Sequence, residues 1–501
     1  MARTAPPGSL VLDDVSGAAD LVGAIVDRIA DGVLADGDRL PSSRALAGQT
    51  GLSRGTVVRA FDELAAAGFI VAEHGSGTRV SAGVVQAARA GARTRGLREA
   101  GPERALAPRR GRSVRDLRPG IPDAGLVDRR AWRSAVRAAA SDGMAGLNPW
   151  EEPSPRLRAE LSGHLRRHRG IADADPLLFD SSRSAIAALC AAFAAERRAS
   201  CGRVPVGPQD RAGPTEPSDA CGIPFHIEDP GYRGALLMAR EQDLDVRFHP
   251  VEADGLDVAV LGDEPGIVFT TPAHQYPLGH RISVDRRVAL VEWARRTGSL
   301  VIEDDYDGEF RYGVAPLPAL VTLPGASGCV AYVGTSSKSV SPDLRVAWCV
   351  PPAALRRSVE RWLAVHRRGP SALPADALGE FIGSGAMDRH LARAARVYSD
   401  RRARLVAALA RECPRLAVTG VEAGLHLCVL LPGLDDEAVV TGLDQAGWRT
   451  RSLSSQSATH AVSGLVLSYS RLGGRGAGEF ASALRVVVGR VRGQEFGPAG
   501  P

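Results

Sequence analysis

The chain has 501 residues, of which 62 are basic and 57 acidic, and its formal charge is +5. This length allows two or more domains with sizeable cores, and the small charge confines any nucleic-acid surface to one part of the chain. No apolar run approaches the roughly 20 residues of a membrane span, and no apolar secretory segment is visible, so we expect a cytoplasmic protein without a membrane partner. The seven cysteines lack the close spacing of metal ligands, and no metal site is predicted.

Periodic apolar residues over 20–34 predict a first amphipathic helix. One face of this helix is formed by Leu21, Ile25, Ile29 and Val33. Ser42 is a suitable N-cap for a short helix that ends at Thr50, and Ser53 precedes a second helix over 54–67. Two short helices joined by a tight Gly-containing turn predict a helix-turn-helix.

Residues 69–80 are typical of two strands that turn on glycines, which would add a wing to the helix-turn-helix. Residues 1–81 as a whole closely resemble the winged-helix domain of the GntR transcription regulators. The similarity is carried by LPSSRALA at 40–47, LSRGTV at 52–57 and HGSGT at 74–78. A small helical protein-interaction module is the alternative interpretation.

The resemblance implies that this domain binds double-stranded operator DNA. Arginine at the start of a recognition helix can read guanine in the major groove, and nearby hydroxyls can contact phosphate. We therefore expect DNA contacts from the two helices and the wing, through Arg44, Ser53, Arg54, Thr56, His74 and Gly75.

Residues 82–115 predict a flexible, Arg-rich linker. Alanine, glycine and arginine dominate this segment, and it contains no aromatic residue. Such a tether can add salt-dependent, sequence-independent phosphate contacts, or it can act only as a solvated spacer.

Residues 116–501 alternate strand and helix patterns, which predicts an α/β sheet of mainly parallel strands. This domain contains Lys338, the single lysine of the chain, whereas the other 61 basic residues are arginine. Arginine replaces lysine in charge and phosphate contacts but not as a nucleophilic amine. An apolar strand over 330–333 precedes the lysine, and Gly334 is predicted to open a turn. Anion-binding groups beside the amine are offered by Thr335, Ser337 and Arg345.

Three further segments place polar residues directly after apolar strands. They are EDPGY at 228–232, TPAHQYPLG at 271–279 and VIEDDYDGEFRY at 301–312. Side chains alternate faces along a strand, so Asp304 and Tyr306 are predicted to share one face and Asp305 to point the other way.

Together these segments resemble fold-type I enzymes that depend on pyridoxal 5′-phosphate (PLP), in an aminotransferase-like form. The resemblance implies a Schiff base on Lys338, the catalytic residue, a carboxylate at Asp304 that keeps the pyridine nitrogen protonated, and a 3-oxygen contact from Tyr306. It also implies that Tyr232 stacks on the ring and that Tyr276 lies in a cofactor-binding loop. The phosphate group would be held by Ser182, Thr335, Ser337 and Arg345. Burial beside Arg345 is expected to lower the pKa of Lys338.

The order of the parts, including the His-Gln-Tyr-Pro sequence at 274–277, resembles the MocR subfamily of GntR-type regulators. This resemblance implies a PLP-dependent transcription regulator that senses an amino compound or PLP itself, built as a head-to-tail homodimer with little or no catalytic turnover. An active aminotransferase with an appended DNA-binding domain is the alternative. A regulator whose sensing domain no longer binds PLP is a third interpretation.

Three departures from the family pattern bear on mechanism. The sequence SRSA at 182–185 replaces a Gly-Ala-Gln-Gln phosphate segment, although a helix N-terminus there would still bind an anion. Val466 stands where some relatives place an arginine for the substrate carboxylate, and Arg471 lies nearby. Residues 197–222 predict an inserted surface loop, because prolines and glycines cluster there.

Overall fold

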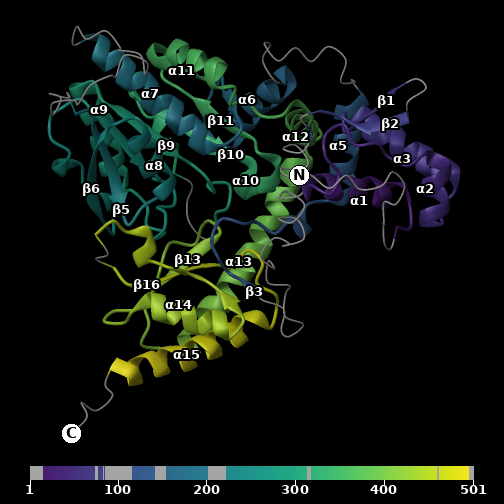
Figure 1. Cartoon of the computed structure of the whole chain (residues 1–501). Helices are drawn as coiled ribbons and strands as arrows, with labels where there is room; N and C mark the ends of the chain where they lie inside the picture. Colours follow the sequence, from purple (N-terminus) through teal and green to yellow (C-terminus); the bar gives the residue numbers. More distant parts are fainter. Residues whose placement is uncertain are drawn as a thin grey trace. The chain divides into compact units, whose positions relative to one another are not determined.

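The structure is a computed structural model that describes residues 15–73, 77–82, 84, 115–141, 154–200, 222–312, 317–459 and 462–495. The chain divides into two compact units, residues 1–112 and 113–501 (Figure 1). Most of the predicted linker lies outside the described residues, so its bounds at 82 and 115 stay predictions.

The N-terminal unit is a winged helix-turn-helix, as predicted. Its elements are α1 (Ala18–Ala30), α2 (Ser43–Thr50), α3 (Arg54–Ala66), β1 (Ile70–Glu73) and β2 (Gly77–Val80). The Ser42 side chain caps α2 by accepting from the Ala45 amide, and the chain leaves α2 at Gly51 with φ +72°. The wing strands are antiparallel, with Ile70 opposite Val80.

One part of the predicted apolar stripe is wrong. Helix α1 ends at Ala30, so Val33 lies beyond the helix and is 56% exposed. Leu34 is buried instead, beside Leu21, Ile25 and Ile29 of the stripe. The four-residue spacing failed at its last member because the turn after α1 rotates the backbone away from the helical period.

The C-terminal unit contains a mixed eight-stranded sheet in the order β4-β11-β10-β9-β8-β5-β6-β7. Strands β5, β6, β8, β9 and β10 run parallel, which confirms the predicted α/β class. Strand β11 is antiparallel to both of its neighbours, β10 and β4, so β4 runs in the direction of the parallel strands, and β7 is antiparallel to β6. The strands are β4 (Leu177–Phe179), β5 (Pro224–Asp229), β6 (Asp245–Glu252), β7 (Gly255–Leu256), β8 (Ile267–Thr270), β9 (Leu300–Asp304), β10 (Val330–Thr335) and β11 (Ala347–Val350). Parallel strands end at one edge, so the segments after β5, β8, β9 and β10 meet there.

Helices cover both faces of this sheet (Figure 1). On one face pack α7 (Ser182–Ser200), α8 (Arg233–Glu241) and α11 (Ala353–His366), and on the other packs α9 (Val284–Thr297). A further core is built around α5 (Arg129–Ser141), α6 (Pro155–Arg169), α12 (Ala372–Gly383) and the long α13 (Ala386–Glu412).

A second, four-stranded sheet has the order β12-β13-β16-β15 and packs against two helices. Its elements are β12 (Val418–Thr419), β13 (His426–Leu430), β15 (Arg451–Ser452), β16 (Gly464–Ser468), α14 (Asp436–Gln445) and α15 (Gly476–Glu495). The short strand β3 (Arg115–Asp116) pairs with β14 (Trp448–Arg449). No helix in the described part of the chain is both long and apolar enough to cross a bilayer.

Two local predictions need correction. Gly334 does not open a turn but lies inside β10, opposite Trp348 of β11. A Cβ atom at Gly334 would come within 2.3 Å of the Trp348 indole nitrogen, so close side-chain packing explains this glycine. The predicted loop at 197–222 also begins too early, because α7 continues to Ser200. Residues 201–221 lie outside the described residues.

Candidate cofactor and DNA-binding sites

A cavity of about 580 Å³ lies where the parallel strands end. This volume is in the range of small-molecule sites. All nine residues predicted to contact a cofactor line it: Ser182, Tyr232, Tyr276, Asp304, Tyr306, Thr335, Ser337, Lys338 and Arg345. Segments far apart in the sequence therefore meet around one space, as the order of the strands requires.

Lys338 lies on α10 (Ser336–Ser339), the single turn that follows β10. Its Nζ donates a hydrogen bond to the Gly120 carbonyl at 2.9 Å. Gly120 has φ +99°, and a Cβ atom there would lie 3.0 Å from Nζ, so the backbone approaches the amine closely. Burial lowers the pKa of Lys338, the charges of Asp304 and Asp307 oppose this shift, and the charge of Arg183 adds to it. The predicted role of Arg345 in that shift is wrong, because the cation near the amine is Arg183.

Asp304 is the last residue of β9, and its side chain is buried with one carboxylate oxygen, Oδ1, lacking a hydrogen-bond partner. Burial, with repulsion from Asp305, raises the pKa of Asp304 to about 7, while Lys338 opposes the rise. Asp305 points away from the cavity, where it pairs with Arg169 at 2.5 Å and accepts from the Tyr332 hydroxyl at 2.7 Å. The unpartnered oxygen fits a site that receives a hydrogen-bond donor from a ligand.

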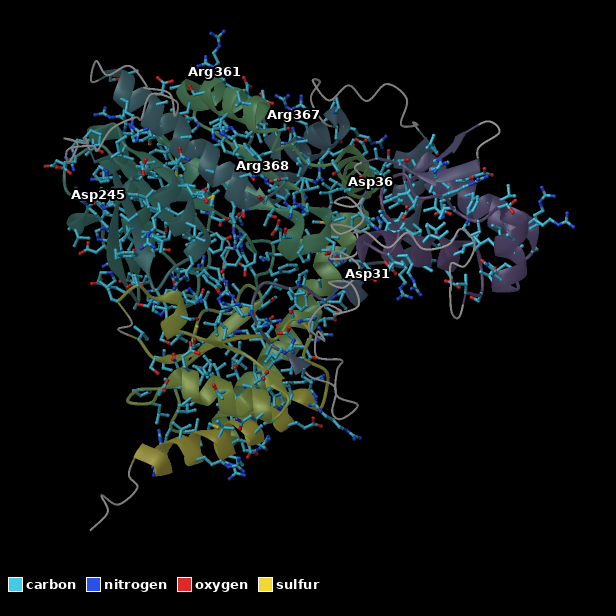
Figure 2. All side chains as sticks on the ribbon, in the orientation of Figure 1. Asp31, Asp36, Asp245, Arg361, Arg367 and Arg368 are labelled. Carbon is cyan, nitrogen blue, oxygen red and sulfur yellow. The ribbon has the colours of Figure 1, made fainter. Side chains whose placement is uncertain are left out.

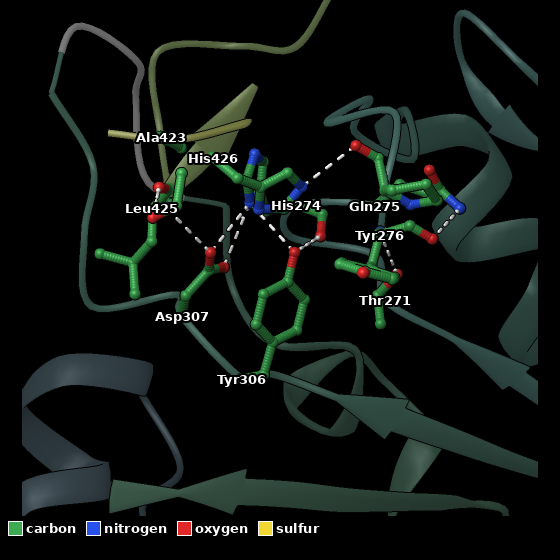
Figure 3. Close-up of polar contacts among 12 residues, drawn as sticks. Thr271, His274, Gln275, Tyr276, Tyr306, Asp307, Ala423, Leu425 and His426 are labelled. Atoms are coloured by element: carbon green, nitrogen blue, oxygen red, sulfur yellow. Dashed lines mark hydrogen bonds and ion pairs between the residues drawn. The ribbon is translucent and has the colours of Figure 1, made fainter. Parts of the chain in front are cut away.

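A buried polar cluster supports Tyr306 at one side of the cavity (Figure 3). The Tyr306 hydroxyl donates to the His274 carbonyl at 2.9 Å, and His274 Nδ1 lies 3.1 Å from Asp307 Oδ2. The Leu425 amide also donates to Asp307, at 3.2 Å. Burial lowers the pKa of His426 to about 3, so this imidazole is neutral at physiological pH. The cluster fixes the direction of the Tyr306 phenol.

Two tyrosines form another wall. Tyr232 follows β5 as the N-cap residue of α8, and its hydroxyl accepts from Arg183 Nε at 3.2 Å. Tyr276 lies edge-on to Tyr232 with ring centroids 6.2 Å apart, and its hydroxyl donates to Gln456 Oε1 at 3.3 Å. These contacts orient two aromatic faces that could hold a flat ring.

Hydroxyl and guanidinium groups gather at the end of the cavity where α7 and α10 begin. Ser182 is the first residue of α7, and Thr335 donates to Ser337 Oγ at 3.0 Å. The Arg345 side chain is 65% exposed and lies 3.5 Å from Asp180. Arg368, labelled in Figure 2, lies 3.6 Å from the same carboxylate. Asp180 therefore competes with any bound anion for Arg345.

Among the cavity residues that the sequence analysis did not select, Arg451 bears on the binding of an acidic group. Arg451 of β15 lines the cavity and is paired across the strands with Val466 of β16. Directly opposed residues in an antiparallel pair share a face, so this guanidinium stands beside Val466, the position at which the family resemblance implies an arginine in some relatives. Arg471 does not line the cavity, since its Nη2 donates to the Asp116 carbonyl at 3.2 Å. The position of Arg451 opposite Val466 follows from the strand register and could not be read from the sequence.

In the N-terminal unit, the predicted DNA-binding residues fall into three groups. Arg44 and Arg54 are exposed on α2 and at the start of α3. Ser53 and Thr56 contact each other at 2.8 Å, and Ser53 also caps α3 by accepting from the Thr56 amide at 3.1 Å. Residues 74 and 75, the predicted wing contacts His74 and Gly75, lie outside the described residues. Arg59, exposed on α3, is a further cation that the sequence analysis did not select.

Comparisons with known proteins bear on both units. Residues 18–80 match the family of bacterial regulatory proteins, gntR family. The chain is 30% identical over 447 residues to the HTH-type pyridoxine biosynthesis transcriptional regulator PdxR of Corynebacterium glutamicum, covering 88% of this chain and 89% of the relative. It is also 30% identical over 442 residues to the probable rhizopine catabolism regulatory protein MocR of Rhizobium meliloti, covering 83% and 82%.

Solved structures show the fold of the larger unit. LysN, an α-aminoadipate aminotransferase from Thermus thermophilus, is 23% identical, covers 76% of this chain and 93% of its own, and has a TM-score of 0.63. A multiple-substrate aminotransferase from Thermococcus profundus has a TM-score of 0.64 at 19% identity, covering 77% of this chain and 93% of its own. With the gntR match and the near full-length relatives, these findings show that the chain belongs to the MocR subfamily of GntR-type transcription regulators, with a winged helix-turn-helix and an aminotransferase-like domain.

Proposed function

We propose that this DNA-binding regulator holds PLP on Lys338 and that the state of the cavity controls its affinity for operator DNA. The observation that carries the proposal is one cavity with a half-buried primary amine and a buried carboxylate oxygen that lacks a partner. PLP would supply an aldehyde and an electron-withdrawing ring. The residues present fit this group, because the amine and the carboxylate are the two partners that its aldehyde and its ring nitrogen need.

Each cavity residue has a distinct task in this proposal. The lowered pKa of Lys338 increases the neutral fraction of the amine, which is the nucleophilic form. Asp304 would accept a hydrogen bond from a protonated ring nitrogen and thereby remain ionised. Tyr306 would donate to a ring oxygen, and Tyr232 would cover the ring. Phosphate oxygens would be held by Ser182, Thr335, Ser337 and Arg345.

Absorption spectroscopy of the full-length protein tests this proposal. Adding PLP to the wild type should produce a visible band from lysine-bound cofactor, and Lys338→Arg should abolish it while keeping the charge. Because the chain has one lysine, borohydride reduction followed by peptide mass spectrometry should find the cofactor only on the Lys338 peptide. An equal band in Lys338→Arg would overturn the assignment, and circular dichroism of this variant checks that it is folded.

The effector is proposed to be an amine that also carries an acidic group, or PLP itself. Arg451 is exposed at the cavity and is the guanidinium nearest in register to Val466. The name of the PdxR relative, which refers to pyridoxine biosynthesis, supports PLP as one effector. A charged hydrogen bond contributes about 1.5–3 kcal/mol, so Arg451→Gln should raise the concentration of an acidic amine needed for half of the spectral change by at least about tenfold.

Arg471→Gln is the matched control, because Arg471 is a nearby arginine directed at the Asp116 carbonyl and not at the cavity. Titration of both variants with amines that have or lack an acidic group isolates the guanidinium's contribution. Equal weakening for both classes of amine would show that Arg451 shapes the cavity without binding the acid.

The alternative of an active aminotransferase is separated by turnover. The amine, the carboxylate and the phenol that such an enzyme uses all line the cavity. An active enzyme would release more keto acid than protein from an amino donor, and a regulator would stop at or below one equivalent. We further propose a homodimer that reads two DNA half-sites, since paired recognition helices multiply sequence specificity.

A further inference from the structure

A cluster of histidine and aspartate residues lies away from the cofactor cavity. His164 and His168 are four residues apart on α6, so both imidazoles project from one face of the helix, with ring centroids 4.4 Å apart. Asp388, in the first turn of α13, faces them. None of the three residues lines the cavity. The predicted absence of a metal site rested on cysteine spacing and did not consider this H-x-x-x-H pair.

The donor atoms of the cluster are close enough for one cation. His168 Nε2 lies 2.8 Å and His164 Nδ1 lies 4.0 Å from Asp388 Oδ1, and all three atoms fall within 4.8 Å of one another. Helical H-x-x-x-H pairs with a third carboxylate ligand form zinc sites, in which metal–nitrogen distances are about 2.0–2.1 Å. A small rotation of the partly exposed His168 ring would bring the three atoms around one ion.

The buried histidine provides independent support. His164 is 1% exposed, and among the described residues its Nδ1 has no hydrogen-bond partner. On the other side of the ring, Nε2 lies 4.0 Å from Glu309 Oε1, and Glu309 Oε2 also lacks a partner. A carboxylate behind a histidine favours the proton on Nε2 and leaves the Nδ1 lone pair directed at the cluster. If this 4.0 Å separation closed to a hydrogen bond on metal binding, Glu309, His164 and the ion would form a carboxylate–histidine–metal triad.

From these contacts we propose that His164, His168 and Asp388 form a binding site for a divalent transition-metal ion of the zinc class. Imidazole and carboxylate ligands suit zinc, cobalt and nickel. A cation beside the cluster, Arg167, has its Nη2 3.7 Å from the second oxygen of Asp388, Oδ2, and not from the proposed ligand atom Oδ1. Partial exposure of His168 and Asp388 leaves a coordination position for water.

A bound ion would connect α6 to the start of α13. The last residue of α6 is Arg169, which holds Asp305 next to Asp304 of the cavity. The metal would therefore brace the helix that supports this ion pair. We expect it to stabilise the C-terminal unit, because a ligand that binds only the folded state shifts the unfolding equilibrium.

Zinc competition with a chromophoric chelator tests the site in full-length protein without added PLP, since PLP itself binds metals. We expect the wild type to bind one equivalent of Zn²⁺, and His168→Ala and Asp388→Asn to bind at least tenfold more weakly. Both residues are partly exposed, so these variants should fold. His366→Ala, which removes an exposed histidine from the end of α11, is the matched control and should bind like the wild type.

Tryptophan fluorescence gives a second readout, because all six tryptophans lie in residues 113–501. At Zn²⁺ 100-fold above its dissociation constant, the unfolding midpoint of the wild type should rise by roughly 2–5 °C, and that of His168→Ala should not. The proposal is overturned if the wild type binds no equimolar Zn²⁺, or if His168→Ala and Asp388→Asn bind as tightly as the wild type. It is also overturned if binding is instead lost in His426→Asn, which would place the ion in the buried His274, Asp307 and His426 group.

Discussion

The side chain of Asp304 destabilises the fold that holds it. Its carboxyl is buried, one oxygen has no partner, and its pKa is raised to about 7. An ionised group in this environment is costly unless a ligand supplies a donor, and such groups gather at functional sites. The same carboxyl would stabilise a bound ring nitrogen. The Asp304 carboxylate therefore lowers the stability of the ligand-free protein and raises its affinity for a ligand with a protonated ring nitrogen.

Replacing this carboxyl by its neutral isostere should stabilise the protein free of PLP. The folded pKa lies above the unfolded value of 3.8, so ionisation weakens folding as pH rises from about 4 to 7 and the full penalty applies above 7. Asp304→Asn should thus raise the free energy of unfolding by roughly 1–3 kcal/mol at pH 8 and by less at pH 5. Urea unfolding followed by tryptophan fluorescence measures this difference.

Asp173→Asn serves as the control for this experiment, because Asp173 is an exposed surface residue of the same unit. It should leave stability unchanged at both pH values. With PLP present the order should reverse, since the amide cannot provide the charge and Asp304→Asn should bind the cofactor more weakly. Stabilisation of Asp304→Asn that did not depend on pH would indicate repacking and not removal of a charge.

At the scale of elements, two neighbouring residues at the start of α3 have different roles: Ser53 stabilises the helix, and Arg54 is predicted to contact DNA. The Ser53 side chain accepts from the Thr56 amide and so caps the helix, whereas the side chain of the adjacent Arg54 is exposed. Loss of a serine cap costs about 1 kcal/mol. Loss of an arginine bound to guanine costs about 1–3 kcal/mol of binding and relaxes specificity at one base pair.

We therefore predict opposite profiles for two neighbouring substitutions. Arg54→Ala should weaken specific DNA binding by about tenfold or more and leave the unfolding of the N-terminal unit unchanged. Ser53→Ala should lower the stability of that unit and weaken binding to all DNA sequences by a similar factor. Fluorescence anisotropy against matched and mutated operator fragments, together with circular dichroism melting, distinguishes the two. Identical losses of specificity would show that Ser53 also reads the DNA.

Local signals in the sequence predicted most of this architecture. Caps such as Ser42 and the alternation that separates Asp304 from Asp305 depend on residues close in the chain. Pairing between strands that lie far apart in the chain could not be predicted from such local signals. The packing of Gly334 against Trp348 and the position of Arg451 beside Val466 depend on strand register. Sequence spacing predicts which residues face a cavity but not which segments from other parts of the chain complete it.

At the scale of the whole molecule, a regulator must couple its two units thermodynamically. If an occupied cavity changes operator affinity by some factor, operator DNA must change the affinity for the cavity ligand by the same factor. Such coupling energies are typically about 1–3 kcal/mol, which corresponds to roughly 5–150-fold. This reciprocity holds wherever the two units lie relative to one another, so it can be tested without knowing their arrangement.

The last prediction uses this reciprocity. Operator fragments selected in vitro by the full-length protein should shift the PLP or amine titration at Lys338 by the factor that the ligand produces in DNA binding. Arg54→Ala should bind PLP normally but lose the shift at DNA concentrations that saturate the wild type. Lys338→Arg should bind DNA with an affinity that PLP no longer changes. A shift that persists in Arg54→Ala and disappears at high salt would trace the effect to nonspecific binding of DNA phosphates. Equal PLP affinity with and without saturating operator would show that the cavity and the DNA-binding unit act independently.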